Sequence, residues 1–244
     1  MIIKAIKTRI FKPRENLISF IESYCPVFKE ATILVVTSKI VALSEGRLMK
    51  ETKDLSKEKI IRQECEVFLP AKYVNLTIRD GVVMANAGVD ESNANGYIIL
   101  LPRDSFLTAA KLRNYFIKKH KLKNFGVIIT DSRSLPLRAG ISGVALGYAG
   151  FVGLKDYRQE LDIFGRPFHF SRVDMADGLA TAAVLNMGEG NERQPLALIT
   201  EAPIKYVNKI KRQELHIKLE EDIYGPIFRD LSKNNKRKIR KRLA

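Results

Sequence analysis

The chain has 244 residues, of which 45% are hydrophobic and 28% are charged, a composition that excludes an intrinsically disordered protein. This length allows a sizeable core, in one domain or in two closely packed halves. The 42 lysines and arginines exceed the 27 aspartates and glutamates, and the resulting charge of +15 favours an anionic partner such as a nucleotide, a phosphorylated metabolite, polyglutamate or nucleic acid.

Neither a disulfide pattern nor a targeting signal is evident in the sequence. Cys25 and Cys65 lack CxxC spacing, so we expect two reduced thiols. Residues 1–7 lack the long apolar stretch of a signal peptide. No segment approaches the roughly 20 apolar residues that a membrane span needs. We therefore expect a cytoplasmic protein that has no membrane partner.

The first third of the chain predicts alternating strands and helices. Leu17, Ile18, Ile21 and Tyr24 recur at helical spacing, and the sequence Arg79-Asp80-Gly81 indicates a hairpin turn. The expected elements are a strand at 2–8, a helix at 15–24, a strand at 33–37, a helix at 57–67, hairpin strands at 73–78 and 82–85, and a short strand at 98–101.

The middle of the chain predicts the clearest α/β unit. Apolar residues at helical spacing favour a helix at 106–120, capped by Asp104 or Ser105. A β-branched run predicts a buried strand that ends at Asp131 and holds this aspartate rigidly at the edge of a sheet. Glycine then recurs through 140–150, either to supply unusual backbone angles or to let another backbone or a ligand approach closely.

An alanine-rich segment at 176–186 predicts a further helix, which Gly188 and Gly190 end at a loop. Asp177 lies near the start of this helix and is interpreted as a capping residue that interacts with the helix dipole. Together the elements favour an α+β fold with mixed sheets and packed helices. Since no linker rich in proline, glycine or serine is present, we expect one compact domain over residues 1–232.

The last residues, 233–244, form a basic tail that repels itself and cannot build a core, so we expect it to be solvated and mobile. The tail and the net charge also leave open a different class of protein. In that alternative the chain is a non-catalytic, basic nucleic-acid-binding protein, and its binding falls steeply with salt.

Two segments of the sequence look alike, at 33–39 and at 127–133. Each is an apolar strand that ends in threonine and polar groups, and each is followed by a glycine several residues later. The pattern predicts two equivalent strand ends that face one site.

Several familiar catalytic motifs are absent. The sequence contains no GxxxxGK[ST] phosphate loop, no GxGxxG after a strand, no HExxH and no GxSxG. His120, His169 and His216 are far apart in the chain, which supports neither a zinc centre nor a Ser-His-Asp triad. Carboxylates, a neighbouring hydroxyl and glycines near basic side chains remain as the candidate chemistry.

Asp90, Asp131 and Glu189 are the candidate catalytic residues, because oxygen ligands from distant segments suit a hard divalent cation. They could hold one or two Mg²⁺ or Mn²⁺ ions, with the hydroxyl of Ser132 at the rim, and the ions would align a phosphoryl group for transfer. A structural interpretation stands beside this one. An aspartate after a strand is usually a turn or cap residue, and Glu189 could simply be an exposed residue of a loop.

The same segments suggest a nucleotide. Lys39 follows a strand end, where it could bind a phosphate as a point charge, or it could be an ordinary solvated lysine. Asn93 could bond a base or a ribose. The glycine-rich backbone at 188–190 could lie close against a nucleotide.

The combination resembles a known family, the coenzyme F-420-0:gamma-glutamyl ligases, which elongate the tail of a deazaflavin cofactor. The resemblance runs from about Ile33 to Ile199, in order and with the family's spacing. The stretches that carry it are Thr37-Ser38-Lys39-Ile40-Val41, Glu45-Gly46-Arg47, Ala87-Gly88-Val89-Asp90, Ser92-Asn93, Val127-Ile128-Ile129-Thr130-Asp131-Ser132, Asp162-Ile163-Phe164-Gly165-Arg166, and Ala176-Asp177 through Met187-Gly188-Glu189-Gly190.

This resemblance implies a homodimeric amide ligase that depends on GTP and a divalent metal. It activates a carboxylate of an anionic acceptor as an acyl phosphate, which the α-amine of L-glutamate attacks. The residues that match the family's metal ligands are Asp90, Asp131, Ser132 and Glu189. Those that match its nucleotide-binding residues are Ser38, Lys39, Asn93, Met187, Gly188, Glu189, Gly190, Asn191, Glu192, Arg193 and Gln194.

The sequence also departs from the family pattern. Thr8-Arg9-Ile10-Phe11 replaces a Gly-Leu-Pro-like loop, Leu43 replaces a frequent lysine, and Ser132-Arg133-Ser134-Leu135-Pro136 replaces Thr-x-Gly-Arg. These changes leave open whether the nucleotide is GTP or ATP. They also leave open a second acceptor, folate, to which the same chemistry would add glutamates.

Overall fold

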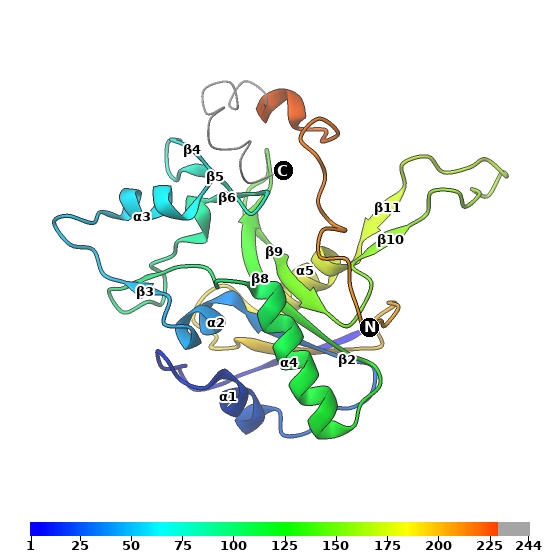
Figure 1. The fold of residues 1–244 in the computed structure, drawn as a ribbon, viewed down its shortest axis with the longest axis horizontal. Coiled ribbons are helices and arrows are strands. Elements are labelled where there is room, and N and C mark those ends of the chain that lie inside the picture. Colours follow the sequence, from blue (N-terminus) through cyan, green and yellow to red (C-terminus); the bar gives the residue numbers. More distant parts are fainter. Residues whose placement is uncertain (229–244) are drawn as a thin grey trace. The chain divides into compact units, whose positions relative to one another are not determined.

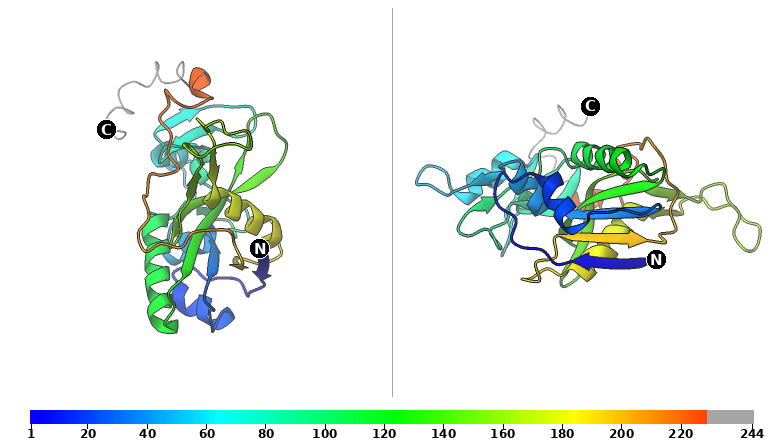
Figure 2. Two further views of the ribbon diagram at one scale, coloured as in Figure 1. Left: turned by 90° about the vertical axis from the view of Figure 1, so that its right-hand side faces the viewer. Right: turned by 90° about the horizontal axis from the view of Figure 1, so that it is seen from below.

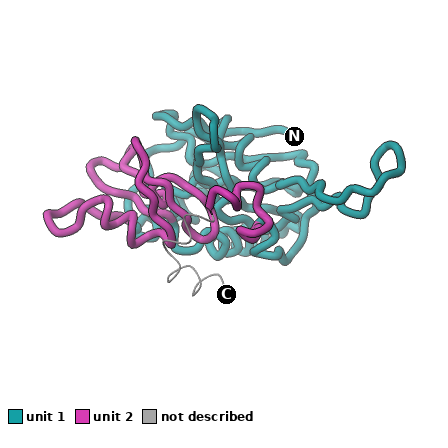
Figure 3. Tube along the Cα trace, turned by 90° about the horizontal axis from the view of Figure 1, so that it is seen from above, with its two compact units in different colours: residues 1–47, 102–215 teal, residues 48–101, 216–244 magenta. Residues whose placement is uncertain are grey.

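The computed structural model describes residues 1–228. The chain forms two compact units (Figure 3): residues 1–47 with 102–215, and residues 48–101 with the segment from 216 onward. The predicted basic tail at 233–244 lies outside the described residues. Within the described part, no helix is both long and apolar enough to cross a bilayer.

The first unit contains a mixed five-stranded sheet (Figure 1). Its spatial order is β1 (Ile2–Ile6), β12 (Leu196–Thr200), β2 (Thr32–Thr37), β8 (Phe125–Ser134) and β9 (Ile141–Ala149). The pair β2 and β8 is parallel, whereas the other neighbours are antiparallel. This arrangement confirms the predicted α+β class with mixed sheets.

Helices cover both faces of this sheet, with α4 (Ser105–His120) and α5 (Met175–Met187) on opposite sides (Figure 2). Along β2, Leu34 and Val36 join a core cluster with α1 (Leu17–Tyr24), α2 (Ser38–Ser44) and α4. The alternate residues Ile33 and Val35 join the cluster that contains α5. Because both faces are buried, the strand reads as one continuous apolar run.

Short polar side chains start the helices of the first unit. Asn16 accepts a hydrogen bond from the Ser19 amide at the start of α1, at 2.9 Å. Asp104 accepts one from the Leu107 amide at the start of α4, at 2.8 Å, which confirms one of the two predicted caps.

The prediction that Asp177 caps α5 was wrong. Asp174 is the capping residue, and its carboxylate accepts the amide of Asp177 at 2.9 Å. The chain already turns into the helix at Asp174, so Asp177 lies within the first turn and directs its carboxylate elsewhere.

The glycine-rich segment 140–150 forms β9, a strand that the sequence did not predict. A Cβ atom at Gly143 would lie 2.7 Å from the carbonyl oxygen of Ala180 in α5, and one at Gly147 would overlap the backbone at the start of α4. A bulge at Leu146 of β9, opposite Ile129 and Thr130 of β8, lies between these two positions and shifts the register. The glycines therefore let one helix approach each face, as the close-approach interpretation anticipated.

A two-stranded arm extends from the first unit (Figure 1). It is built on β10 (Leu154–Asp156) and β11 (Arg172–Asp174), which pair antiparallel. Beyond these strands the chain runs through residues 157–171, with an isolated bridge between Leu161 and Pro167.

The second unit is smaller and has its own apolar cluster around Ile60, Ile61 and Val89. Its elements are β3 (Leu48–Met49), α3 (Lys57–Glu64), β4 (Val67–Leu69), β5 (Leu76–Arg79), β6 (Val82–Ala85), the 3₁₀ turn η1 (Asn86–Gly88) and β7 (Ile98–Ile99). Strands β4, β5 and β6 form one antiparallel sheet, and β3 pairs with β7.

Three predicted boundaries in the second unit needed correction, and one of them is the strand predicted at 98–101, which ends at Ile99 as β7. The hairpin is confirmed, although β5 begins at Leu76 rather than at residue 73. The helix predicted at 57–67 ends at Glu64, because Val67 pairs with Ile78 in the sheet. Strand pairing therefore replaces the last turn of the expected helix.

Candidate functional site

The centre of the candidate site is the point where β2 and β8 stop pairing. The last aligned pair of these parallel strands is Thr37 and Thr130, so the two look-alike segments pair in register and their ends lie side by side. The next residues, Ser38 and Asp131, face each other across this end. The Ser38 hydroxyl donates to Oδ1 of Asp131 at 3.2 Å, and Ser38 is almost completely buried.

Asp131 does not end its strand, contrary to the sequence prediction. Strand β8 continues to Ser134 because β9 supplies a partner beyond the end of β2, with Asp131 opposite Val144 and Ser132 opposite Gly143. Asp131 is nevertheless the first residue past the parallel pair, and antiparallel pairing on its other side holds its backbone. The aspartate is therefore fixed more firmly than a strand end would fix it.

Adjacent residues of β8 face opposite sides of the sheet. Asp131 bonds Ser38 of α2, whereas Ser132 lies opposite Gly143, whose missing side chain would point at α5. On that second side the Ser132 hydroxyl donates to Oε1 of Glu189. In this unit the predicted metal ligands therefore belong to two oxygen pairs. Asp131 pairs with Ser38, a predicted nucleotide-binding residue, and Ser132 pairs with Glu189.

Sheet pairing brings the loop at 187–194 to the same end of β2. Helix α5 ends at Met187, and Gly188 leaves it with a φ of 81°. The Thr37 amide donates to the carbonyl of Pro195 at 3.0 Å, immediately before β12 pairs with β2. The residues predicted to contact a nucleotide in this unit, Ser38, Lys39 and the loop, therefore lie at one edge of the sheet.

The loop already holds an anionic group against its glycines. The carboxylate of Glu192 folds back beside Gly188 and accepts the amide of Gly190 at 2.8 Å. The side chain of Gln194 donates to the carbonyl of Met187 at 3.1 Å, which closes the loop. A backbone amide that binds a carboxylate oxygen can equally bind a phosphate oxygen.

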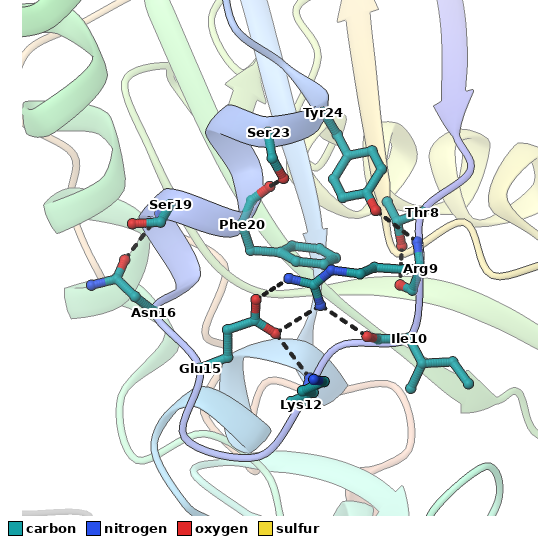
Figure 4. A network of polar contacts seen from close by, with 10 residues as sticks. All are labelled: Thr8, Arg9, Ile10, Lys12, Glu15, Asn16, Ser19, Phe20, Ser23 and Tyr24. Carbon is teal, nitrogen blue, oxygen red and sulfur yellow. Dashed lines mark hydrogen bonds and ion pairs between the residues drawn. The ribbon is translucent and has the colours of Figure 1, made fainter.

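The N-terminal loop that departs from the family pattern is tied to this glycine loop. The Thr8 amide donates to the carbonyl of Arg193 at 2.8 Å. Beside it, Figure 4 shows the guanidinium of Arg9 in a two-pronged ion pair with Glu15. The same guanidinium lies 5.0 Å from the centroid of the Phe20 ring. The hydrogen bonds from Arg9 lower the pKa of Glu15 to about 2. A charged latch thus stabilises the loop in place of glycine and proline.

Asp177 and Arg133 form a contact near the site that their positions in the sequence did not predict. Asp177 accepts the amide of Ala145 at 2.9 Å and pairs with Arg133 at 2.8 Å, which links α5 to both β8 and β9. Burial raises the pKa of the neighbouring cap, Asp174, to about 6. The three-residue spacing of the two aspartates is the signal that identifies the first as the cap and releases the second for another contact.

Asp90 and Asn93 belong to the second unit. The carboxylate of Asp90 accepts both the amide and the hydroxyl of Ser92, each at 2.7 Å, and its backbone pairs with Ile99. Asn93 is exposed and has a φ of 54°. Asp90 therefore has the geometry of an aspartate that stabilises a turn, which is also compatible with a half-buried metal ligand.

Within residues 1–228, no three histidine, cysteine, aspartate or glutamate side chains gather into a group that could hold a metal ion. The donor atoms of the site in the first unit are carboxylate and hydroxyl oxygens. This set suits Mg²⁺ or Mn²⁺ and not a soft metal. Both cysteines are free thiols, as predicted.

The fold and the site define an α+β protein with oxygen donors at one sheet edge, beside a glycine loop that holds the Glu192 carboxylate. Comparison with known proteins is more specific. Residues 5–201 match the F420-0:gamma-glutamyl ligase family. A coenzyme F420:L-glutamate ligase of Methanococcus maripaludis strain C7 is 34% identical and covers 92% of this chain and 100% of its own length.

Similar relatives occur in other organisms. A coenzyme F420:L-glutamate ligase of Methanocaldococcus jannaschii is 33% identical, over 88% of this chain and 93% of its own. That of Methanopyrus kandleri is also 33% identical, over 78% and 82%. The chain belongs to the F420-0:gamma-glutamyl ligase family.

Proposed function

We propose that this protein is a γ-glutamyl ligase that joins L-glutamate to a coenzyme F-420-0-like acceptor, with GTP and Mg²⁺ or Mn²⁺. The observation that carries the proposal is the meeting of Ser38 with Asp131 and of Ser132 with Glu189 at the edge where β2 ends. Family membership and the names of the relatives support the acceptor and the bond formed. A homodimer in the cytoplasm is part of the same proposal.

The residues proposed to hold the metal are Asp90, Asp131, Ser132 and Glu189. Their carboxylate and hydroxyl oxygens fit a hard divalent cation, which, when bound, would neutralise phosphate charge during phosphoryl transfer. Strand β8 presents Asp131 and Ser132 to opposite faces, so one rigid strand can serve two oxygen clusters.

The residues proposed to bind the nucleotide are Ser38, Lys39, Asn93 and the loop 187–194. Lys39 lies in the first turn of α2, directly after the buried Ser38. The carboxylate of Glu192 on the Gly190 amide supports the use of this loop as an oxyanion site. In this proposal a phosphate oxygen of GTP displaces the carboxylate when it binds.

The proposed reaction has two steps. A carboxylate oxygen of the acceptor attacks the γ-phosphorus of GTP, the bond to the β-phosphate oxygen breaks, and GDP leaves. The α-amine of glutamate then attacks the acyl carbon of the acyl phosphate, and phosphate leaves as the amide forms and the amine loses a proton. Lys39 and the loop amides bind the phosphate oxygens and stabilise the charge that develops there.

A ligase assay with one component omitted at a time tests this function. The full chain is mixed with F-420-0, glutamate, GTP and Mn²⁺, and the products are weighed by mass spectrometry. We expect an added glutamyl residue and GDP, and neither product when the metal, GTP or glutamate is absent. Product without GTP, or no product in the complete mixture, would contradict the proposal.

Folate is the alternative acceptor, and the Arg9–Glu15 latch at 8–15 is the observation that favours testing it, because this loop replaces the family's Gly-Leu-Pro-like segment beside the glycine loop. Tetrahydrofolate and F-420-0 supplied together, with GTP and ATP in separate reactions, distinguish the acceptors and the nucleotides. Glutamylation of tetrahydrofolate alone would replace the first proposal by the second.

A further inference from the structure

The turn before Asp90 has an unusual backbone. Asn86, Ala87 and Gly88 have φ angles of 50°, 54° and 69°, so consecutive residues lie in the left-handed region. Only glycine enters this region freely, and an alanine there is strained. Such a conformation persists where surrounding contacts hold it, and it is often found beside functional groups.

A buried hydroxyl fixes the strained alanine. Thr77 of β5 accepts the amide of Ala87 at 2.7 Å and donates to the carbonyl of Met84 at 2.7 Å. Both Thr77 and Ala87 are completely buried. Without the hydroxyl, the Ala87 amide would lose its partner in a place that water does not reach.

Two further polar contacts hold the same turn. Oδ1 of Asn86 accepts the backbone amide of Asn75 at 2.9 Å and its side-chain amide at 3.2 Å. Arg79 donates to the carbonyl of Ala87 at 3.4 Å and pairs with Glu64 at 2.8 Å. The turn is therefore fixed from β5 and from α3.

The opposite side of the turn is closed by packing. A Cβ atom at Gly88 would lie 2.5 Å from Leu101, so the backbone there lies directly against this side chain. The Val89 amide then donates to the carbonyl of Asn86 at 2.9 Å, and Asp90 pairs with Ile99. The geometry of the turn consequently sets the direction in which the chain reaches Asp90.

We propose that Thr77 is a positioning residue for Asp90: its hydroxyl holds the left-handed turn, and the turn aims the Asp90 carboxylate. This inference rests on the proposed role of Asp90 as a metal ligand. Because Thr77 is completely buried, we assign it no direct contact with the substrates or the metal. It acts through the Ala87 amide and the backbone that follows.

A titration of the full chain with Mn²⁺ alone, read from the electron paramagnetic resonance signal of free Mn²⁺, tests the inference. Thr77→Val keeps the shape and removes the hydroxyl, and we expect the dissociation constant for Mn²⁺ to rise about tenfold or more, as for other outer contacts of metal ligands. Thr77→Ser restores the hydroxyl and should return the constant to within about twofold of the wild-type value.

Thr32→Val is the matched control. Thr32 is a buried threonine at the start of β2 in the other unit, so the same substitution there should leave Mn²⁺ binding within about twofold of wild type. Circular dichroism identifies the variants that are folded. Should Thr77→Val not fold, Asn86→Gly carries the test, since glycine accepts the left-handed backbone but lacks the acceptor for Asn75. It should weaken Mn²⁺ binding in the same direction, by less.

Folded Thr77→Val or Asn86→Gly that binds Mn²⁺ as tightly as wild type would overturn the inference. Asp90→Asn separates this outcome from failure of the proposed function. If wild type binds Mn²⁺ and Asp90→Asn does not, the metal role of Asp90 stands whatever the Thr77 variants show. If the two bind alike, or wild type binds none, the metal role falls and the inference falls with it.

Discussion

Two carboxylates that the sequence predicts as metal ligands, one in each unit, are held by different means. Asp131 is placed by strand register: it follows the last parallel pair of β2 and β8 and is paired on its other side with Val144. Asp90 is placed by a strained turn whose geometry depends on buried polar contacts, chiefly the hydroxyl of Thr77. In the sheet, many backbone hydrogen bonds hold the aspartate in place, whereas in the turn a few side chains do so.

This difference predicts opposite sensitivities. Around Asp131, removal of a neighbouring side chain should change the reaction rate more than the position of Asp131, because strand pairing fixes the backbone of β8 without that side chain. Around Asp90, loss of a single distant hydroxyl should change the position of the Asp90 carboxylate. Substitutions in the first unit test this difference.

Glu189→Gln should have the largest effect among these. The amide keeps an oxygen for the Ser132 hydroxyl but loses the negative charge, so we expect a loss in the rate of glutamate addition on the order of a hundredfold. Glu160→Gln, an exposed glutamate of the arm, is the control and should retain the full rate. Equal rates for the two variants, both folded, would remove Glu189 from the site.

Gly143→Ala tests whether close packing of β9 supports the register at Asp131. The added methyl group would meet the backbone of Ala180 and the side chain of Val184, so we expect a loss of about 1 to 3 kcal/mol in the free energy of unfolding. Gly178→Ala is the matched control: its position in α5 is open, so it should gain up to about 1 kcal/mol. Urea denaturation measures both, and a stable Gly143→Ala would argue against tight packing there.

Asp174→Asn tests the burial of the cap that begins α5. Because burial raises the folded pKa of Asp174 from 3.8 to about 6, the wild type loses stability as the pH rises through that interval. Asparagine caps a helix equally well and does not ionise. We expect the variant to exceed wild type by on the order of 1 kcal/mol above pH 6 and to match it below pH 4.

The measurement for this cap is the free energy of unfolding of both proteins across pH 3.5 to 7.5. A difference that does not change over the interval between 3.8 and about 6 would show that Asp174 is not desolvated.

Glu15→Gln should give the smallest effect, since the Arg9–Glu15 latch lies at the surface. We expect a rise of a few-fold in KM for GTP, transmitted through the bond between Thr8 and Arg193. Because the pKa of Glu15 is lowered from 4.5 to about 2, the ion pair of the latch contributes its full stabilisation above pH 4.5 and loses it as the pH falls toward about 2. The effect of Glu15→Gln on KM should therefore be constant at neutral pH.

Glu22→Gln is the control for the latch. Glu22 lies in the neighbouring helix α1 and accepts hydrogen bonds from Lys119 and Tyr115. Both of these partners belong to α4 and not to the glycine loop. An equal rise in KM for both variants would indicate a general effect of lost surface charge.

The sequence allowed the register-based half of this site to be predicted. The runs at 33–37 and 127–131 have the apolar, β-branched composition of buried strands, and their likeness predicted two equivalent strand ends at one site. The contact between Ser38 and Asp131 is visible only in the structure. The helix after Asp104 was equally clear, because its cap and its apolar spacing agree.

The rest depended on tertiary contacts. Strand β9 is rich in glycine, which disfavours strands. It forms because it pairs with β8 and because its glycines leave room for a helix on each face. The bond between Thr77 and Ala87 spans ten residues and joins a strand to a turn, so no local pattern in the sequence indicates it.

Asp131, at the edge where β2 ends, is the residue on which the proposed reaction depends most directly. The most direct measurement is the Mn²⁺-dependent rate of glutamate addition by Asp131→Asn, beside Asp156→Asn, an exposed carboxylate of the arm paired with Arg158. We expect the first variant to fold and to lose turnover by a hundredfold or more, on the order of the loss seen when a charge-stabilising group is removed, and the second to keep the wild-type rate. A folded Asp131→Asn enzyme with the wild-type rate would contradict the account.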